Sequence, residues 1–222
     1  MELACILFDL DGTLVDTAPD LMRCLNLSLA RHGFPEASDT AVKPFISFGA
    51  RAMIAAGLAE PVASGVRETL LATMLDCYER HIADQSSFFA GIEETLAQIE
   101  AQGLKWGVVT NKRERFTNPL MAALNLTDRA ACIVSGDTTA YSKPHPGPML
   151  AACEQAGVKP EQCVYIGDAV HDIAAGKNAH MKTLAASYGY LKPGDRPETW
   201  GADSVIDSPL QITDWIGAHR CR

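Results

Sequence analysis

The sequence has no long hydrophobic run and no basic leader. No apolar stretch approaches the roughly 18 residues that a membrane-spanning helix needs. The first residues lack the positive charge and the long apolar segment of a secretory signal, and Asp9 and Asp11 interrupt the apolar run that begins at Cys5. We therefore expect a cytoplasmic protein with no membrane partner.

An excess of positive charge is also missing. The chain has 19 Lys and Arg against 27 Asp and Glu, and its formal net charge is −8 at pH 7. Nucleic acids and anionic membrane surfaces bind basic faces, so neither is expected as a partner. A small anionic substrate remains compatible, provided that a metal ion and a few cations gather in one cleft. The sequence leaves both a monomer and a homodimer open.

Paired cysteine motifs are absent as well. The seven cysteines show no Cys-x-x-Cys spacing and are scattered over positions 5, 24, 77, 132, 153, 163 and 221. Most lie inside apolar runs, so we interpret them as buried small hydrophobic residues in a reducing cytosol.

No strand pattern occurs between residues 16 and 89. Apolar residues at helical spacing predict helices at about residues 17–33, 38–57 and 64–83, the second broken near Pro44 and again at 47–49. This stretch is predicted to be an all-helical block that comes after the first strand.

What the sequence does contain, near its start, is a short apolar run that ends in two acids. Cys5-Ile6-Leu7-Phe8 is typical of a strand buried on both faces of a parallel sheet, and Asp9, Asp11 and Gly12 come directly after it. Two carboxylates at a dry strand end repel each other unless a cation or a proton intervenes. A hairpin turn at Asp11-Gly12 is an alternative, whereas a helix-loop-helix calcium site would need its glycine at another loop position.

From residue 91 onward, helices and strands alternate, which predicts an α/β fold with a doubly wound parallel sheet. Strands are expected at about 104–111, 131–135, 163–166, 183–186 and 204–207, and Pro119 is expected near the start of the regular part of its helix. Polar residues follow several strand ends, and they are Thr110, Asn111, Lys143, Asp168 and Asp172.

In a doubly wound sheet these strand ends converge on one crevice. A group of carboxylates with hardly any His or Cys nearby suits a hard, oxygen-binding cation such as Mg²⁺. Taken singly, Thr110-Asn111 is also typical of a helix cap, Lys143 of a surface charge and Asp168 of an N-cap. Only the ordered set is specific.

That ordered set resembles the haloacid-dehalogenase superfamily. The family's phosphatases have Asp-x-Asp-Gly-Thr, Thr/Ser-Asn, a Lys before Pro and Gly-Asp-x-x-x-Asp, which correspond here to residues 9–13, 110–111, 143–144 and 167–172. The resemblance implies a Rossmann-like α/β core domain of residues 1–15 and 90–222, and an inserted helical cap domain of residues 16–89. Dehalogenase members lack the second aspartate, so the presence of Asp11 favours phosphoryl chemistry.

Finer features resemble two branches of this family. Residues 16–20, 49–51 and 142–144 look like the phosphoglycolate-phosphatase branch. Residues 106–112, 188–190 and 200–203 look more like a sub-branch that dephosphorylates N-acetylmuramate 6-phosphate in cell-wall recycling. Both branches remain open.

The resemblance implies a role for each site residue, as a hypothesis. Asp9 attacks phosphorus to form an aspartyl-phosphate, and Asp11 is the general acid and then the general base. Mg²⁺ is held by Asp9, Asp168 and the backbone carbonyl of Asp11, with Asp172 in support directly or through water. The phosphoryl oxygens are bound by Thr110, Asn111 and Lys143.

Arg51 follows a glycine at a break between helical segments of the cap. An arginine at a helix start is usually solvated, but a guanidinium there could bind a substrate carboxylate bidentately. Phosphoglycolate and N-acetylmuramate 6-phosphate both carry such a carboxylate.

Three other functions remain open. A sugar phosphomutase shares every motif and differs only in returning the phosphoryl group to the sugar. A phosphoacceptor signalling domain uses an aspartate, a threonine and a lysine around Mg²⁺, but has no helical insert after its first strand and no use for Asp11. A catalytically silent binding protein would be expected to have lost one of the motif residues.

Overall fold

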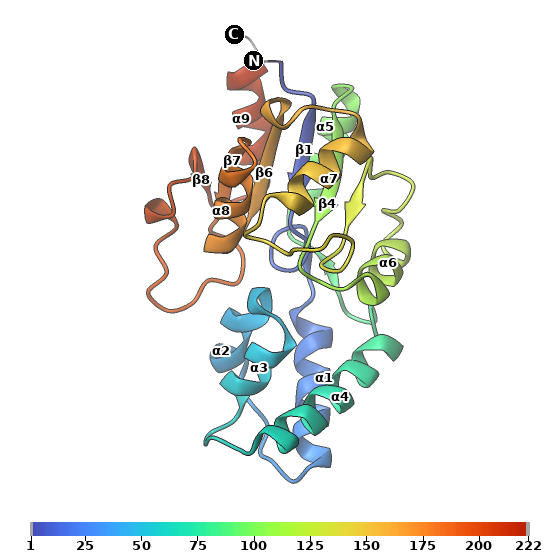
Figure 1. Ribbon diagram of the computed structural model, residues 1–222, viewed down its shortest axis with the longest axis vertical. Coiled ribbons are helices and arrows are strands. Elements are labelled where there is room, and N and C mark those ends of the chain that lie inside the picture. The colour runs from blue at the N-terminus through green and yellow to red at the C-terminus, as the bar shows by residue number, and fades with distance from the viewer. Residues whose placement is uncertain (1, 221–222) are drawn as a thin grey trace.

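Six parallel strands form the central sheet of the computed structural model, in the order β5-β4-β1-β6-β7-β8 (Figure 1). The structure describes residues 2–220. The strands are β1 (Cys5–Phe8), β4 (Lys105–Val109), β5 (Ile133–Val134), β6 (Cys163–Gly167), β7 (Lys182–Ala186) and β8 (Ser204–Ile206). β1 pairs with β4 on one side and β6 on the other, so Phe8 lies beside Val108 and Ile166.

β1 lies where the strand order reverses. The chain builds outward from β1 through β4 and β5, and then returns to the other side of β1 to build through β6, β7 and β8. In such sheets the ligand crevice lies outside the carboxyl ends of the strands at this switch point. The predicted α/β fold with a doubly wound parallel sheet is confirmed, and Asp9 follows its central strand.

Helices cover both faces of the sheet. Because side chains alternate along a strand, Ile6 and Phe8 pack on one face with α5, α6 and α9, whereas Cys5 and Leu7 pack on the other with α7 and α8. These helices are α5 (Ile92–Ala101), α6 (Glu114–Ala123), α7 (Gly147–Ala156), α8 (Val170–Asn178) and α9 (Gln211–Arg220). Two short 3-10 turns, η2 (Pro160–Gln162) and η3 (Pro197–Thr199), complete this part.

A second group of helices is inserted between β1 and β4. It consists of α1 (Ala18–Arg31), α2 (Asp39–Val42), the 3-10 helix η1 (Lys43–Phe48), α3 (Ala50–Gly57) and α4 (Ser64–Arg80). These helices share their own apolar core, in which Leu25, Leu70 and Met74 are fully buried. Figure 1 shows them as a separate body beside the sheet. The inserted helical cap is confirmed, whereas its division at residues 15/16 and 89/90 stays a prediction.

The region between residues 16 and 89 was expected to contain no strand, and this is wrong at both of its ends. β2 (Val15–Asp16) and β3 (Ser87–Phe88) form a short antiparallel ribbon, with Val15 opposite Phe88. Two residues per strand are too few for an alternating pattern to be visible in the sequence. The ribbon joins the two segments that connect the cap to the sheet.

The interpretation of the cysteines needs a correction. The six at positions 5, 24, 77, 132, 153 and 163 are buried as expected, but Cys24 of α1 and Cys77 of α4 form a disulfide. Their Cα atoms are 5.5 Å apart, within the range that a disulfide spans. The partners are 53 residues apart, so only the packing of α1 on α4 brings them together. Cys221 lies outside the described residues.

Two further helices differ from expectation. Pro119 lies inside α6 rather than near its start, because Asp137 Oδ1 accepts a hydrogen bond from Glu114 N and helps the helix to begin earlier. Helix α9 was not predicted, although Ile212 and Ile216 are one turn apart and fully buried. Among residues 2–220, no helix is long and apolar enough to cross a membrane.

Candidate active site

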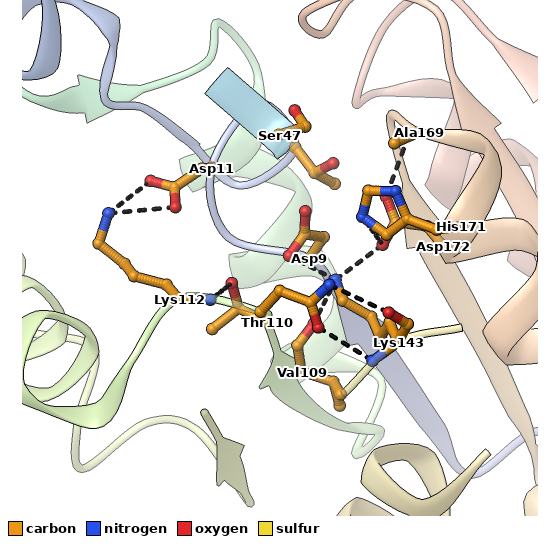
Figure 2. A network of polar contacts seen from close by, with 12 residues as sticks. Asp9, Asp11, Ser47, Val109, Thr110, Lys112, Lys143, Ala169, His171 and Asp172 are labelled. Carbon is orange, nitrogen blue, oxygen red and sulfur yellow. Dashed lines mark hydrogen bonds and ion pairs between the residues drawn. The ribbon is translucent and has the colours of Figure 1, made fainter. Parts of the chain in front are cut away.

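Three buried carboxylates meet at the carboxyl ends of β1 and β6 (Figure 2). Asp9, Asp168 and Asp172 each offer an oxygen, and these oxygens lie within 4.8 Å of one another. None of the three residues is more than 4% exposed. The predicted convergence of strand-end acids on one point is therefore present in the structure.

The local backbone explains why the acids meet. Asp9 N donates to Ile166 O at 2.8 Å, which continues the pairing of β1 with β6 and carries Asp9 to the strand end. Asp168 follows β6 directly, and Asp172 lies in the first turn of α8, where its Oδ2 accepts from Ala169 N at 3.0 Å. Asp172 is thus also the residue that caps α8.

Two glycines leave room for Asp168. Gly12 has a φ of 90°, and a Cβ placed there would overlap the Asp168 carboxylate. A Cβ on Gly189 would overlap both the Asp168 side chain and Gly12 O. Only glycine allows the two loops to approach this carboxylate so closely.

Lys143 lies between two of the acids. Its Nζ donates to Asp9 Oδ1 at 2.8 Å and to Asp172 Oδ1 at 2.7 Å, and also to Tyr165 Oη and Val109 O. Burial by itself would lower the pKa of Lys143, but the facing Asp172 and Asp9 carboxylates raise it above its usual value. Lys143 is therefore a buried ammonium group, not the solvated surface charge of the alternative interpretation.

One lysine does not neutralise three acids. Burial raises the pKa of Asp9 to about 6, although the Lys143 ammonium opposes this, and Asp172 adds to the increase. Burial, followed by the charges of Asp172 and Asp9, raises the pKa of Asp168 well above its usual range. Carboxylates in this state are stabilised by a bound cation. The all-oxygen ligand set fits a divalent metal ion of the hard class.

Asp11 has different partners from Asp9, although the two belong to one loop. Its carboxylate accepts from Lys112 Nζ at 2.9 and 3.1 Å and from Thr17 Oγ1 at 2.6 Å. Figure 2 shows it pointing toward Lys112, whereas Asp9 points toward Lys143. Lys112 had no predicted role. The signal that could have identified it is a cation directly after the polar strand end Thr110-Asn111.

Thr110 and Asn111 follow β4 as predicted, and both are engaged with the protein itself. Thr110 Oγ1 accepts from Lys112 N at 3.1 Å. The side-chain amide of Asn111 accepts from Lys143 N at 3.0 Å and donates to Lys143 O at 3.2 Å. In the structure, Asn111 therefore holds the backbone that carries the buried lysine.

Arg51 makes no hydrogen bond or ion pair with any of these residues within residues 2–220. Its guanidinium forms a bidentate ion pair with Glu68 of α4, and the side chains of both residues are more than half exposed. This contact holds the pKa of Glu68 below its usual value, through the hydrogen bond from Arg51. In this state the guanidinium already has a carboxylate partner.

The cap touches the acidic cluster through η1. Ser47 Oγ donates to Asp168 Oδ2 at 2.9 Å, and the ring of Phe48 meets the ring of His171 edge-on at 5.5 Å between centroids. Figure 2 places Ser47 above Asp9 and His171 beside Asp172. The cap is thus closed over the strand ends.

Tyr190, in the loop after β7, links the acidic cluster to the segment that enters the cap. Its backbone N–H donates to Asp168 Oδ2 at 2.8 Å. Its hydroxyl donates to Asp16 Oδ1 at 2.6 Å and accepts from Ala18 N at 3.0 Å. Sequence reasoning noted Tyr190 only as part of a resemblance, since the path of this loop is not encoded by a local pattern.

Comparison with known proteins gives concordant results. A family model described as haloacid dehalogenase-like hydrolase matches residues 6–186. The chain is similar to an N-acetylmuramic acid 6-phosphate phosphatase of Pseudomonas aeruginosa, with 43% identity over 100% of this chain and 98% of that protein. It is also similar to a phosphoglycolate phosphatase of Xanthomonas campestris, with 40% identity over 93% of each chain. The crystal structure of a predicted phosphoglycolate phosphatase from Haemophilus somnus aligns with a TM-score of 0.87, 26% identity and coverage of 97% and 99%.

Proposed function

Because the chain belongs to the haloacid dehalogenase-like hydrolases, we propose that it is a phosphatase that uses the Asp9, Asp168 and Asp172 cluster to hydrolyse a small phosphomonoester. The observation that carries this proposal is the meeting of three buried carboxylates and the Lys143 ammonium at the switch point of the sheet. The full-length likeness to two phosphatases supports it.

Asp9 is the proposed nucleophile. It stands at the end of the central strand, fixed by its backbone bond to Ile166 and by the contact of its carboxylate with Lys143. Attack of the carboxylate on phosphorus gives an aspartyl-phosphate and releases the alcohol, and water then hydrolyses this acyl phosphate. Splitting the reaction in this way replaces one difficult displacement by two easier ones.

Asp11 is the proposed general acid and base. It first gives a proton to the leaving oxygen and then takes one from the attacking water. Two residues fix the position of its carboxylate. Lys112 comes from the loop after β4, and Thr17 comes from the base of the cap. Because Thr17 directly precedes α1, the orientation of Asp11 depends on how the cap is seated.

The proposed metal ion is Mg²⁺, held by Asp9 and Asp168 together with the backbone carbonyl of Asp11, and supported by Asp172. When bound, this ion neutralises charge so that carboxylate and phosphate can approach each other. Lys143 and Thr110 bind phosphoryl oxygens. Thr110 directly follows β4, which pairs with β1, and Lys143 contacts Asp9 from the loop after β5. We assign Asn111 to this site too, and its role is to position Lys143.

The proposed substrate carries a carboxylate besides its phosphate. N-acetylmuramic acid 6-phosphate and phosphoglycolate, on which the relatives act by name, share this feature. From the sequence, Arg51 is the cap residue expected to bind this carboxylate. To do so, its guanidinium would have to release Glu68.

Replacement of the nucleophile tests the proposal. Asp9→Asn is expected to lower phosphate release from both named substrates by at least about 10⁴-fold, because the amide cannot form the covalent intermediate. Asp128→Asn, which changes an exposed aspartate elsewhere, is expected to leave the rate unchanged. Removal of metal with a chelator is expected to abolish activity of the unmodified protein, and added Mg²⁺ to restore it. Activity of Asp9→Asn within tenfold of the unmodified protein would reject the assignment.

A further inference from the structure

Lys192 is a cation at the cap–core boundary that lacks an acidic partner. Its Nζ lies 3.2 Å from the ring centroid of Phe48 and 5.5 Å from that of Phe45, both in η1. Its backbone N–H donates to Asp195, but its ammonium forms no ion pair with a carboxylate among residues 2–220. An aromatic ring face is the weaker of the two kinds of partner that an ammonium group finds in proteins.

The other lysines around the site are already paired. Lys143 faces Asp9 and Asp172, and Lys112 faces both oxygens of Asp11. Lys43 lies 4.0 Å from Asp16. Arg51 is held by Glu68. Among these residues, Lys192 is thus a cation whose charge remains available for an anionic group from outside the protein.

Two chains of contacts connect Lys192 to the acidic cluster through neighbouring residues. Tyr190, two residues earlier, donates its backbone N–H to Asp168. From the cap side, Ser47 donates to Asp168, and Phe48 lies directly beneath the Lys192 ammonium. The cation therefore approaches the crevice from the side where cap and core meet.

The Lys192 ammonium itself contacts the rings of Phe48 and Phe45 and makes no ion pair with Asp9, Asp168 or Asp172. Phe48 in turn meets the ring of His171, the neighbour of Asp172. A substrate group at Lys192 therefore lies beside the aromatic side chains of η1, whereas the phosphate is proposed to lie at Asp9.

We propose that Lys192 is a specificity-determining residue that binds a substrate carboxylate remote from the phosphate, beside the Phe48 ring. This inference rests on the proposed phosphatase function and makes its substrate class narrower. In phosphoglycolate one methylene separates the carboxyl group from the ester oxygen, so the carboxylate stays close to the phosphate. In N-acetylmuramate 6-phosphate the lactyl carboxylate is attached to the sugar ring away from the phosphorylated C6. The substrate class is therefore a sugar phosphate with a carboxylate across the ring.

The test compares two sugar phosphates that differ only in the carboxylate. N-acetylglucosamine 6-phosphate has the ring, the acetamide and the phosphate of N-acetylmuramate 6-phosphate, but lacks the lactyl group. The unmodified protein is expected to hydrolyse the muramate with the higher kcat/KM. Lys192→Met is expected to lower kcat/KM for the muramate about 10- to 100-fold, mainly through KM, because one charge-assisted contact is lost. Its kcat/KM for the glucosamine substrate should stay unchanged.

Matched variants separate charge from structure. Lys192→Arg keeps the cation and is expected to retain most of the preference for the muramate. Lys159→Met removes an exposed lysine elsewhere on the core and is expected to behave like the unmodified protein.

Several results would overturn the proposal. These are an equal fall on both sugar phosphates in Lys192→Met, a preference unaffected by that change, or a preference lost in Arg51→Met instead. A much higher kcat/KM of the unmodified protein on phosphoglycolate would overturn it too. These failures all leave an active phosphatase, whereas an unmodified protein inactive on every phosphomonoester would refute the proposed function itself.

Discussion

Lys143 Nζ has four acceptors within hydrogen-bond distance of its three N–H groups, two carboxylate and two neutral oxygens, in a space from which water is nearly excluded. Asp9 and Asp172 therefore share one counterion, whereas the donors to Asp168 among residues 2–220 are neutral, namely Ser47, Thr13 and the backbone of Tyr190. The charge of the cluster is left incompletely balanced. At the scale of single residues, this imbalance is what makes the site a receptor for a cation.

Asn111 provides the first test at this scale. Asn111→Ala removes both hydrogen bonds to the Lys143 backbone, so the segment that carries the lysine loses its attachment to the end of β4. We expect the free energy of unfolding of the ligand-free protein to fall by about 1 kcal/mol. We expect kcat to fall by about 10- to 100-fold, because the lysine is no longer held in place. Urea denaturation and steady-state kinetics measure the two effects.

Asn118→Ala is the matched control, since Asn118 is an exposed amide on α6 that bonds only to Glu114. It should change neither quantity. If Asn111 acted instead through a direct side-chain contact with phosphate, Asn111→Ala would weaken phosphate binding and leave the stability of the ligand-free protein unaltered.

Three of the predicted site residues share one property. Asp9, Thr110 and Asp168 directly follow buried strands, so the order of strands in a doubly wound sheet is enough to bring them together. Lys192 and Tyr190 lie in a loop with no regular pattern, and their contacts arise from how that loop packs on the cap. Their roles are therefore decided by tertiary structure.

At the scale of elements, the connection between cap and sheet rests on more than the β2–β3 ribbon. Asp20 in the first turn of α1 is fully buried, and its Oδ2 accepts from Gln85 N, Ser86 N and Ser86 Oγ at 3.0, 2.8 and 2.8 Å. One carboxylate thus ties the segment that enters the cap to the segment that leaves it. The sequence indicated Asp20 only as an acid at a helix start, because the partners of its Oδ2 are more than 60 residues away.

Removal of this carboxylate is expected to destabilise the connection strongly. Asp20→Ala leaves two backbone N–H groups and a hydroxyl without their acceptor, and we expect the free energy of unfolding to fall by about 3 kcal/mol. Chemical denaturation measures the change. Asp84→Ala is the control, since Asp84 is an exposed acid that pairs with Arg23 and His81. Surface ion pairs of this kind contribute little to stability, so the denaturation midpoint of Asp84→Ala should hardly change. Equal effects of the two variants would show that the hydrogen bonds of Asp20 do not stabilise the connection between cap and sheet.

The helices of the cap illustrate what periodicity predicts and what it does not. The helix expected at about 64–83 corresponds to α4, because apolar residues recur every turn along it. The disulfide between α1 and α4 and the short ribbon at the base have no local signal. Both depend on how the helices of the cap pack against one another, which is determined by the tertiary structure and not by the local sequence.

At the scale of the whole molecule, several polar contacts between the cap and the sheet end on site residues or their neighbours. Ser47 of the cap reaches Asp168, and Lys112 lies between Asp11 and the ring of Tyr78 in α4, 4.6 Å from its centroid. Two connecting segments join the two bodies (Figure 1), and Phe116 of α6 and Tyr190 also pack into the apolar core of the cap. An arrangement of this kind couples the seating of the cap to the geometry of the acids, and closure over a site excludes water from the reaction.

Tyr190 is the residue through which this coupling can be tested, because it contacts Asp168 with its backbone and the cap connection with its hydroxyl. Tyr190→Phe removes the hydroxyl that donates to Asp16 Oδ1 and accepts from Ala18 N, which leaves these two groups with their bond to each other, at a cost of about 1–2 kcal/mol to the closed arrangement. A change of this size shifts the ratio of closed to open molecules by about 5- to 30-fold. We expect KM to rise within that range, and the radius of gyration measured by small-angle scattering to increase. In Tyr188→Phe, the control, the lost hydroxyl donates to Thr13 O within the core, so neither quantity should change. A Tyr190→Phe protein with unaltered scattering and KM would show that the cap closes independently of this residue.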